Sequence, residues 1–126
     1  MIADRDWIVV AFASLSMTGI DRSAAPEVLA RGAPDPVPAL LIGRLAVDRS
    51  YAGLGVGAAL VAHALATAVE LNAAAACRAV AVTSLNTRAR SWWERFGFQP
   101  LDVGDPVGLD LFLLTKDIEA TLRRLH

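Results

Sequence analysis

Residues 39–57 read ALLIGRLAVDRSYAGLGVG, an apolar run followed by a short polar turn and three closely spaced glycines. The apolar run, Ala39 to Val47, is interrupted only by Gly43 and Arg44, and its length suits a strand that is buried on both faces. From Gly55 to about Ala76, apolar residues recur at helical spacing and alanines keep the helix propensity high. This stretch therefore predicts a central strand, a glycine-rich turn and a long helix.

The glycine-rich turn is the first candidate for a binding site. Gly53, Gly55 and Gly57 let the backbone turn its N–H groups toward one point, and the helix that follows adds a partial positive charge at its N-terminus. This arrangement predicts a ligand that carries a diphosphate, and a purely structural turn is the alternative. A Walker A loop would require Gly-Lys-Ser/Thr, and a dinucleotide-binding fold would place the loop near its first strand. Neither pattern fits.

The segment before residue 39 is predicted to be a hairpin and a loop. A short strand, Met1 to Ala3, precedes a turn at Asp4-Arg5-Asp6 and a strand from Trp7 to Met17 that is rich in apolar, aromatic and β-branched residues. Residues 21–38 hold four of the chain's six prolines. We expect a surface loop there, with one helical turn around residues 26–31.

The segment after residue 77 is predicted to alternate strands and helices. Asn86 is placed to cap a helix from Thr87 to about Arg95, and Gly97 is placed to end it. The remaining predicted elements are a strand at Arg78–Thr83, a strand at Leu109–Thr115 and a final helix at Asp117–Leu125.

Composition narrows the possible classes of protein. The 126 residues are 55% hydrophobic, with a mean hydropathy of +0.45, which suits one domain spanning residues 1–126. No apolar stretch approaches the roughly 20 residues of a membrane span, and no secretion signal is recognisable, so we expect a cytoplasmic protein. A single cysteine, Cys77, excludes an internal disulfide, and no His/Cys cluster has metal-binding spacing. The net charge of −1 gives no global attraction for nucleic acid, although local basic patches are compatible with it.

Two motifs resemble the GNAT acetyltransferases. The family's signature, Gln/Arg-x-x-Gly-x-Gly/Ala after its fourth strand, is similar to residues 52–57, whose glycines match. Ala52 stands where the family has Gln or Arg, so one side-chain contact to a pyrophosphate is missing. Asn86-x-x-Ala89, followed by Trp92-Trp93 and then Gly97-Phe98, resembles the family's second segment.

The resemblance implies a fold, a cosubstrate and a set of binding residues. The fold is α/β (α+β), with a mixed, mostly antiparallel sheet flanked by helices and splayed beside the glycine turn, and the cosubstrate is acetyl-CoA. The implied contacts are the main chain of Leu45, Ala46 and Val47 around the pantetheine arm, the side chain of Asn86 on that arm, and the turn residues Gly53, Leu54, Gly55, Val56 and Gly57 at the pyrophosphate. The plainer interpretations are ordinary strand residues and, for Asn86, a helix N-cap.

The beginning of the chain departs from the family's pattern. GNAT domains usually start with a strand and two helices that shape the acceptor site, whereas only a few residues here precede the first hairpin. We therefore expect an N-terminally short GNAT fold. The apolar surface that such helices would cover favours a homodimer.

A closer resemblance is to the GNAT toxins of toxin–antitoxin pairs. It rests on residues 34–38, Pro-Asp-Pro-Val-Pro, and on residues 43–50, Gly-Arg-Leu-Ala-Val-Asp-Arg-Ser. It implies acetylation of the α-amino group of aminoacyl-tRNA, arrest of translation, and neutralisation by a ribbon-helix-helix antitoxin. Phosphate contacts would then come from arginines, and the candidates, whose alternative is a solvated face, are Arg49, Arg88, Arg90 and Arg95.

Two other activities are compatible with the same motifs. One is a general GNAT that acetylates a small amine or a protein N-terminus, which the near-neutral net charge favours. The other is a catalytically silent or weakened homologue that keeps CoA or an antitoxin as its ligand.

The silent alternative follows from Trp93, which stands where the family usually has a tyrosine as general acid. An indole N–H donates a hydrogen bond but does not release its proton, whereas a tyrosine hydroxyl titrates near about 10. We therefore assign no catalytic residue and expect Trp92 and Trp93 to pack in the core and the groove. The remaining polar candidates, for which the sequence indicates no partner arrangement, are Tyr51, Ser14, Ser16, Ser84 and His63. Cys77 is expected to be buried filler.

Overall fold

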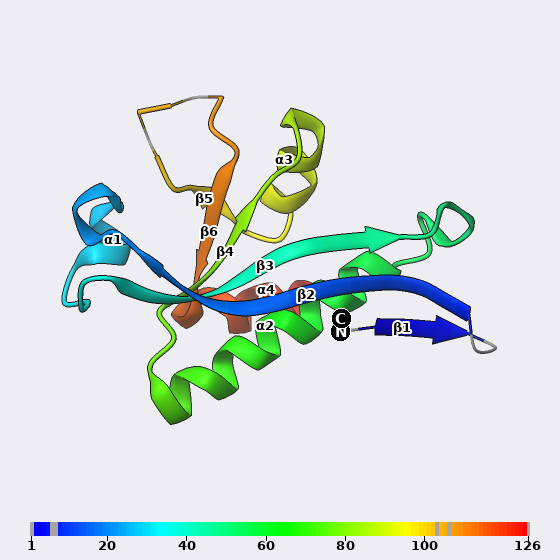
Figure 1. The fold of residues 1–126 in the computed structure, drawn as a ribbon, viewed down its shortest axis with the longest axis horizontal. Helices are drawn as coiled ribbons and strands as arrows, with labels where there is room; N and C mark the ends of the chain where they lie inside the picture. Colours follow the sequence, from blue (N-terminus) through cyan, green and yellow to red (C-terminus); the bar gives the residue numbers. More distant parts are fainter. Residues whose placement is uncertain (1, 6–7, 103, 106, 126) are drawn as a thin grey trace.

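The computed structural model describes residues 2–5, 8–102, 104–105 and 107–125, and its centre is one six-stranded sheet (Figure 1). The sheet order is β1-β2-β3-β4-β6-β5. Only β3 and β4 run parallel, and every other pair of neighbours is antiparallel, so the predicted mixed, mostly antiparallel sheet is confirmed. The strands are β1 (Ile2–Arg5), β2 (Ile8–Ile20), β3 (Val37–Val47), β4 (Ala79–Thr83), β5 (Gln99–Pro100) and β6 (Asp110–Leu114).

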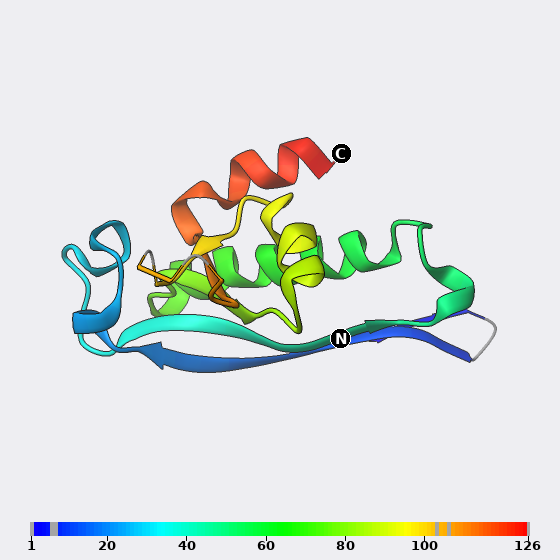
Figure 2. The same ribbon diagram turned by 90° about the horizontal axis from the view of Figure 1, so that it is seen from above.

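Helices cover both faces of this sheet. The long helix α2 (Val56–Ala75) and the C-terminal helix α4 (Ile118–Leu125) lie beside each other on one face (Figure 2). The helix α3 (Thr87–Glu94) packs into the same core cluster, and the short helix α1 (Glu27–Ala30) belongs to a cluster on the opposite face. Within the described residues, no helix combines the length and the apolar character that crossing a membrane requires.

The alternation of side chains along β4 separates the two cores. Val80 and Val82 belong to the cluster that contains α2, whereas Ala79 and Ala81 pack with Leu29 of α1. All four β4 residues are buried, as expected for a central strand with a helix on each face.

Several predicted boundaries are corrected by the pairing of strands. The loop predicted at residues 21–38 ends at Pro36, because Val37 and Pro38 already pair with β2. The predicted turn at residues 4–6 is wrong for Asp4 and Arg5, which belong to β1 and pair with β2. Residues 6 and 7 lie outside the described residues. The two-residue strand β5 was not predicted, because it is too short to show a periodicity.

The prediction that residues 39–47 are buried on both faces is only half right. β3 is largely buried from Val37 to Ile42, but Gly43 to Val47 are exposed or half-buried. The reason is that β4 pairs only with Ala39–Ile42. Beyond that point β3 keeps one neighbour, β2, and its other edge is open.

Candidate functional site

The site begins where β3 and β4 separate. Ile42 and Val82 form the last pair of the parallel ladder, and the pairing of β3 with β2 shifts register at the adjacent residue, Gly43. A methyl group on Gly43 would lie 2.9 Å from Ser14 Oγ, so the bulge accepts only glycine without rearrangement. β3 therefore bends away with β2 and leaves β4 behind.

The separation opens a cleft of about 1230 Å³. Residues 42–47 of β3 form one wall, and the end of β4 together with α3 forms the other. The glycine-rich turn closes one end of the cleft, and Phe12 of β2 also contributes to the lining. Its lining is mainly apolar, as is usual for sites that hold an elongated organic ligand.

The glycine-rich turn has the geometry that anion binding requires. Asp48 accepts a hydrogen bond from Ser50 N at 2.8 Å and starts a short 3₁₀ turn, which leads into Gly53 and Gly55. These glycines have φ of 79° and 82°, a conformation that a side chain would strain. Gly55 is also the N-cap of α2 and carries no side chain to bond the first N–H groups of the helix. Those groups are available to a diphosphate.

The predicted binding residues fall into two groups. Those that line the cleft are Leu45, Ala46, Val47, Gly53, Gly55, Val56 and Gly57. Leu54 lies within the turn, but it is 68% exposed and lines a different pocket, so only its main chain remains a candidate contact for the ligand. Asn86 is outside the lining, although its neighbours Leu85 and Ala89 are part of it.

Asn86 begins α3, as the sequence predicts. Its Oδ1 accepts a hydrogen bond from Ala89 N at 2.8 Å, and Gly97, with φ of 97°, follows the helix end. Because the cap uses only the oxygen, the NH₂ group of the Asn86 side chain keeps its capacity to donate.

The two tryptophans pack as expected. Trp93 is 6% exposed, and its ring meets those of Trp92, Phe96 and Phe98 at centroid distances of 5.0, 6.4 and 5.3 Å. Both tryptophans also line the cleft, so Trp93 sits at the boundary between the core and the site.

The arginines predicted to contact phosphate differ in their surroundings. Arg90 donates to Gly108 O at 2.6 Å and pairs with Glu94 at 3.5 Å, so a structural role replaces the predicted phosphate contact. Arg49, Arg88 and Arg95 are exposed, and Arg95 lines the cleft. Arg44 also lines the cleft from β3 and was not predicted. Its signal in the sequence was a charge in an otherwise apolar strand.

The other polar candidates also differ in whether they line the cleft. Tyr51 and Ser84 line the cleft, whereas Ser14 and Ser16 of β2 do not. Cys77 is fully buried, as expected, and burial raises the pKa of its thiol. The described residues include no group of His, Cys, Asp and Glu that could hold a metal ion.

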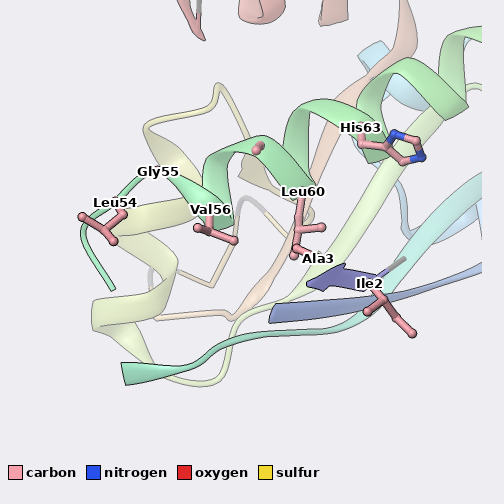
Figure 3. A pocket seen from close by; sticks show the side chains of 8 residues that line it. Ile2, Ala3, Leu54, Gly55, Val56, Leu60 and His63 are labelled. Atoms are coloured by element: carbon pink, nitrogen blue, oxygen red, sulfur yellow. The ribbon is translucent and has the colours of Figure 1, made fainter. Parts of the chain in front are cut away.

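A second, smaller pocket of about 620 Å³ lies between β1 and the start of α2 (Figure 3). Its labelled side chains are mostly apolar, from Ile2 and Ala3 on one side to Leu54, Val56 and Leu60 on the other. His63, on the next turn of α2, is the single titratable group among them. No acid–base pair is therefore formed by the lining of this pocket.

Most of the sequence matches one known protein family. Residues 3–98 match the model of the acetyltransferase (GNAT) family. The chain belongs to the GNAT family.

One relative of this GNAT chain is a tRNA-acetylating toxin. The chain is 37% identical over 118 residues to a tRNA-acetylating toxin of Mycobacterium tuberculosis (strain ATCC 25618 / H37Rv), covering 94% of this chain and 69% of that protein. Its fold is similar to that of AtaT complexed with acetyl-methionyl-tRNAfMet, with a TM-score of 0.79, 32% identity, and coverage of 90% of this chain and 66% of that one.

A second similar structure is a mutant of the AtaT toxin bound to the C-terminus of the antitoxin AtaR and acetyl-CoA. Its TM-score is 0.74 with 31% identity, and the match covers 92% of this chain and 67% of that one. The GNAT chain described here thus spans about two thirds of the length of the relatives that it matches.

Proposed function

We propose that this GNAT protein binds acetyl-CoA in the cleft between β3 and β4 and transfers the acetyl group to the α-amino group of aminoacyl-tRNA. The observation that carries the proposal is the divergence of the two parallel strands after Ile42 and Val82, which opens a cleft that the glycine-rich turn closes at one end. The 37% identity to a tRNA-acetylating toxin supports the choice of acceptor.

The open edge of β3 suits the pantetheine arm. Residues 44–47 pair with β2 on one side, and their other edge faces the cleft. Backbone N–H and C=O groups at such an edge need hydrogen-bond partners, and the amides of a pantetheine arm supply both a donor and an acceptor. We infer that Leu45, Ala46 and Val47 bind the arm while Gly53 to Gly57 bind the pyrophosphate.

Arginines at the cleft support a polyanionic acceptor. Arg44 on β3 and Arg95 at the end of α3 are both exposed and both line the cleft, on opposite walls. A guanidinium binds phosphate through two parallel hydrogen bonds, so these side chains are placed to hold the acceptor end of a tRNA. Arg49 and Arg88 are exposed and extend the same proposal to the surface around the cleft.

The acetyl transfer can proceed without a general acid, although more slowly. An α-amine titrates near about 7.7–8.0 and is partly neutral at physiological pH, and a thiol near about 8.5 is a good leaving group as its thiolate. Trp93 provides no proton, and the loss of a general acid typically costs about 10²–10⁴-fold in rate. We therefore expect a slow transferase.

Two partners belong to the same proposal. A ribbon-helix-helix antitoxin would neutralise the enzyme, in keeping with the solved complex of AtaT with the C-terminus of AtaR. A homodimer would cover exposed apolar residues such as Ile2 and Leu54 beside the second pocket. Acetylation of aminoacyl-tRNA would place the protein in the cytoplasm.

Calorimetry with acetyl-CoA, followed by transfer of labelled acetyl to bulk aminoacyl-tRNA, tests the proposal. We expect binding and label on aminoacyl-tRNA, with deacylated tRNA unlabelled. Arg95→Ala should reduce transfer to tRNA, whereas Arg31→Ala, outside the cleft, should not. Absence of binding would remove the cofactor assignment on which the proposal depends.

Trp93 specifically favours a second candidate, a catalytically silent protein that binds CoA or an antitoxin. Binding of acetyl-CoA with no transfer to tRNA, small amines or protein N-termini would identify it. Transfer to amines or N-termini alone would instead identify a general GNAT.

A further inference from the structure

Ser84 carries a buried hydroxyl that forms no hydrogen bond with the described residues. The residue is 2% exposed, and its Oγ has no hydrogen-bond partner among the described residues. Burying a hydroxyl without a partner is unfavourable, and such groups are rare in native proteins. The backbone of Ser84 is fixed, because its N–H donates to Leu109 O at 2.7 Å.

Ser84 lies close to the point where β3 and β4 separate. It follows Val82, the last residue of β4 that pairs with β3, by two positions, and it lines the cleft. The alternation of a strand places Ser84 on the same face as Val82 and the aromatic core around Trp93. Thr83, on the other face, is satisfied by Asp110 Oδ1 at 2.7 Å. Both residues line the cleft, and of their two hydroxyls only that of Ser84 has no hydrogen-bond partner among the described residues.

The proposed binding mode brings the reactive end of acetyl-CoA to this point. If the pyrophosphate is held at Gly53 to Gly57, beyond the C-terminal end of β3, a pantetheine arm running back along β3 directs the thioester toward Gly43 and Ile42. Ser84 lines the same cleft as these two residues and directly follows β4, the strand that pairs with β3 as far as Ile42. This inference rests on the proposed function, because it requires acetyl-CoA in the cleft.

We propose that Ser84 Oγ–H donates a hydrogen bond to the carbonyl oxygen of the acetyl thioester, which makes Ser84 a catalytic residue. When the acceptor nitrogen bonds to the carbonyl carbon, the π electron pair moves to the oxygen, which becomes negative. The pair then returns, the C–S bond breaks, and the CoA thiolate takes up the proton that the amine gives up. A fixed donor stabilises the negative oxygen more than the neutral carbonyl.

The hydrogen bond is tested directly by infrared spectroscopy of [1-¹³C]acetyl-CoA bound to the protein. We expect the ¹³C=O band to move to lower wavenumber on binding to the wild type, and to return toward its free position in Ser84→Ala. Ser91→Ala is the matched control, because Ser91 lies exposed on α3 with its Oγ bonded to Thr87 O. A band at the same position in Ser84→Ala and wild type would overturn the proposal and assign the carbonyl to another donor.

Turnover provides the second readout. Ser84→Ala should lower kcat by about 10²-fold with little change in KM, since oxyanion donors act mainly in the transition state. Its melting temperature should not fall, because the hydroxyl has no partner to lose. Unchanged kcat in Ser84→Ala would overturn the catalytic role. An infrared shift that depends on Ser84 in a protein that does not acetylate aminoacyl-tRNA would uphold Ser84 and reject only the acceptor.

Discussion

Gly57 lies against the indole of Trp92. A methyl group on Gly57 would be 3.2 Å from Trp92 Cζ2 and 3.5 Å from Val47 Cγ2. The start of α2, the end of β3 and α3 therefore meet so closely that a methyl group at position 57 would press on the Trp92 ring. Gly57 favours close packing, whereas Gly53 and Gly55 are required for their positive φ. One short turn thus contains glycines that serve two different physical purposes.

The turn is expected to lose its ligand when its backbone is changed. Gly55→Ala introduces a side chain at φ of 82°, although no atom lies within 4 Å of the new methyl group. We expect a loss of about 1–2 kcal/mol in the free energy of unfolding, from left-handed strain. Acetyl-CoA affinity should fall at least about 10-fold, because the N–H groups that bind the diphosphate change direction. Denaturant unfolding and calorimetry measure the two effects.

Gly32→Ala is the matched control for this change. Gly32 has φ of 69° and equally open surroundings, but it lies outside the cleft. We expect the same loss of stability with unchanged acetyl-CoA affinity. If both variants lost affinity equally, the effect would be global and the turn would not be the diphosphate site.

Introducing a hydroxyl at position 93 is expected to raise activity and lower stability. Trp93→Tyr supplies a proton donor to the cleft, and we expect kcat to increase by up to about 10²-fold. The smaller ring leaves a gap between Trp92, Phe96 and Phe98, which should cost about 1–2 kcal/mol in the free energy of unfolding. Trp93→Phe creates the same gap without the hydroxyl. Equal rates in the tyrosine and phenylalanine variants would rule out a proton-donor role at this position.

Two substitutions at Asn86 separate its structural role from binding. Asn86→Ala removes the bond to Ala89 N and should lower the free energy of unfolding by about 1 kcal/mol. Asn86→Asp keeps an oxygen for the cap and loses only the NH₂ donor, so its stability should stay close to that of the wild type. Both variants should bind acetyl-CoA more weakly in calorimetry. Wild-type affinity in Asn86→Asp would show that the residue is a cap alone.

Cys77 is expected to make stability fall at high pH. Burial raises the pKa of its thiol above that of the unfolded chain, near about 8.5. The folded state then keeps its proton while the unfolded state releases one, so this contribution is fully present below the unfolded pKa and is lost as the pH rises above it. Between pH 7 and pH 10, the free energy of unfolding should decrease less for Cys77→Ala than for the wild type. An equal decrease in both proteins would show that titratable groups other than Cys77 cause the loss of stability.

Features that depend on neighbouring residues could be predicted from the sequence. The helix after the glycine turn, the cap at Asn86 and the end of α3 at Gly97 were all correct, because backbone φ and capping hydrogen bonds are local. The two GNAT motifs are also short segments, and they led to the family that the comparison with known sequences confirms.

Features that depend on pairing between distant segments could not be predicted. The exposed half of β3 follows from β4 pairing only as far as Ile42, and the engagement of Arg90 follows from a loop 18 residues away. Leu54, within the motif, faces the second pocket because of how the turn enters α2.

The sequence by itself thus determined the order of strands and helices apart from β5, the glycine turn and the family, because each is recorded in residues a few positions apart. Only the tertiary structure decided where β3 and β4 separate, which arginines line the cleft, and that the buried hydroxyl of Ser84 has no partner among the described residues. Those properties arise from the register between strands, in which the partners of a residue are set by segments far from it along the chain.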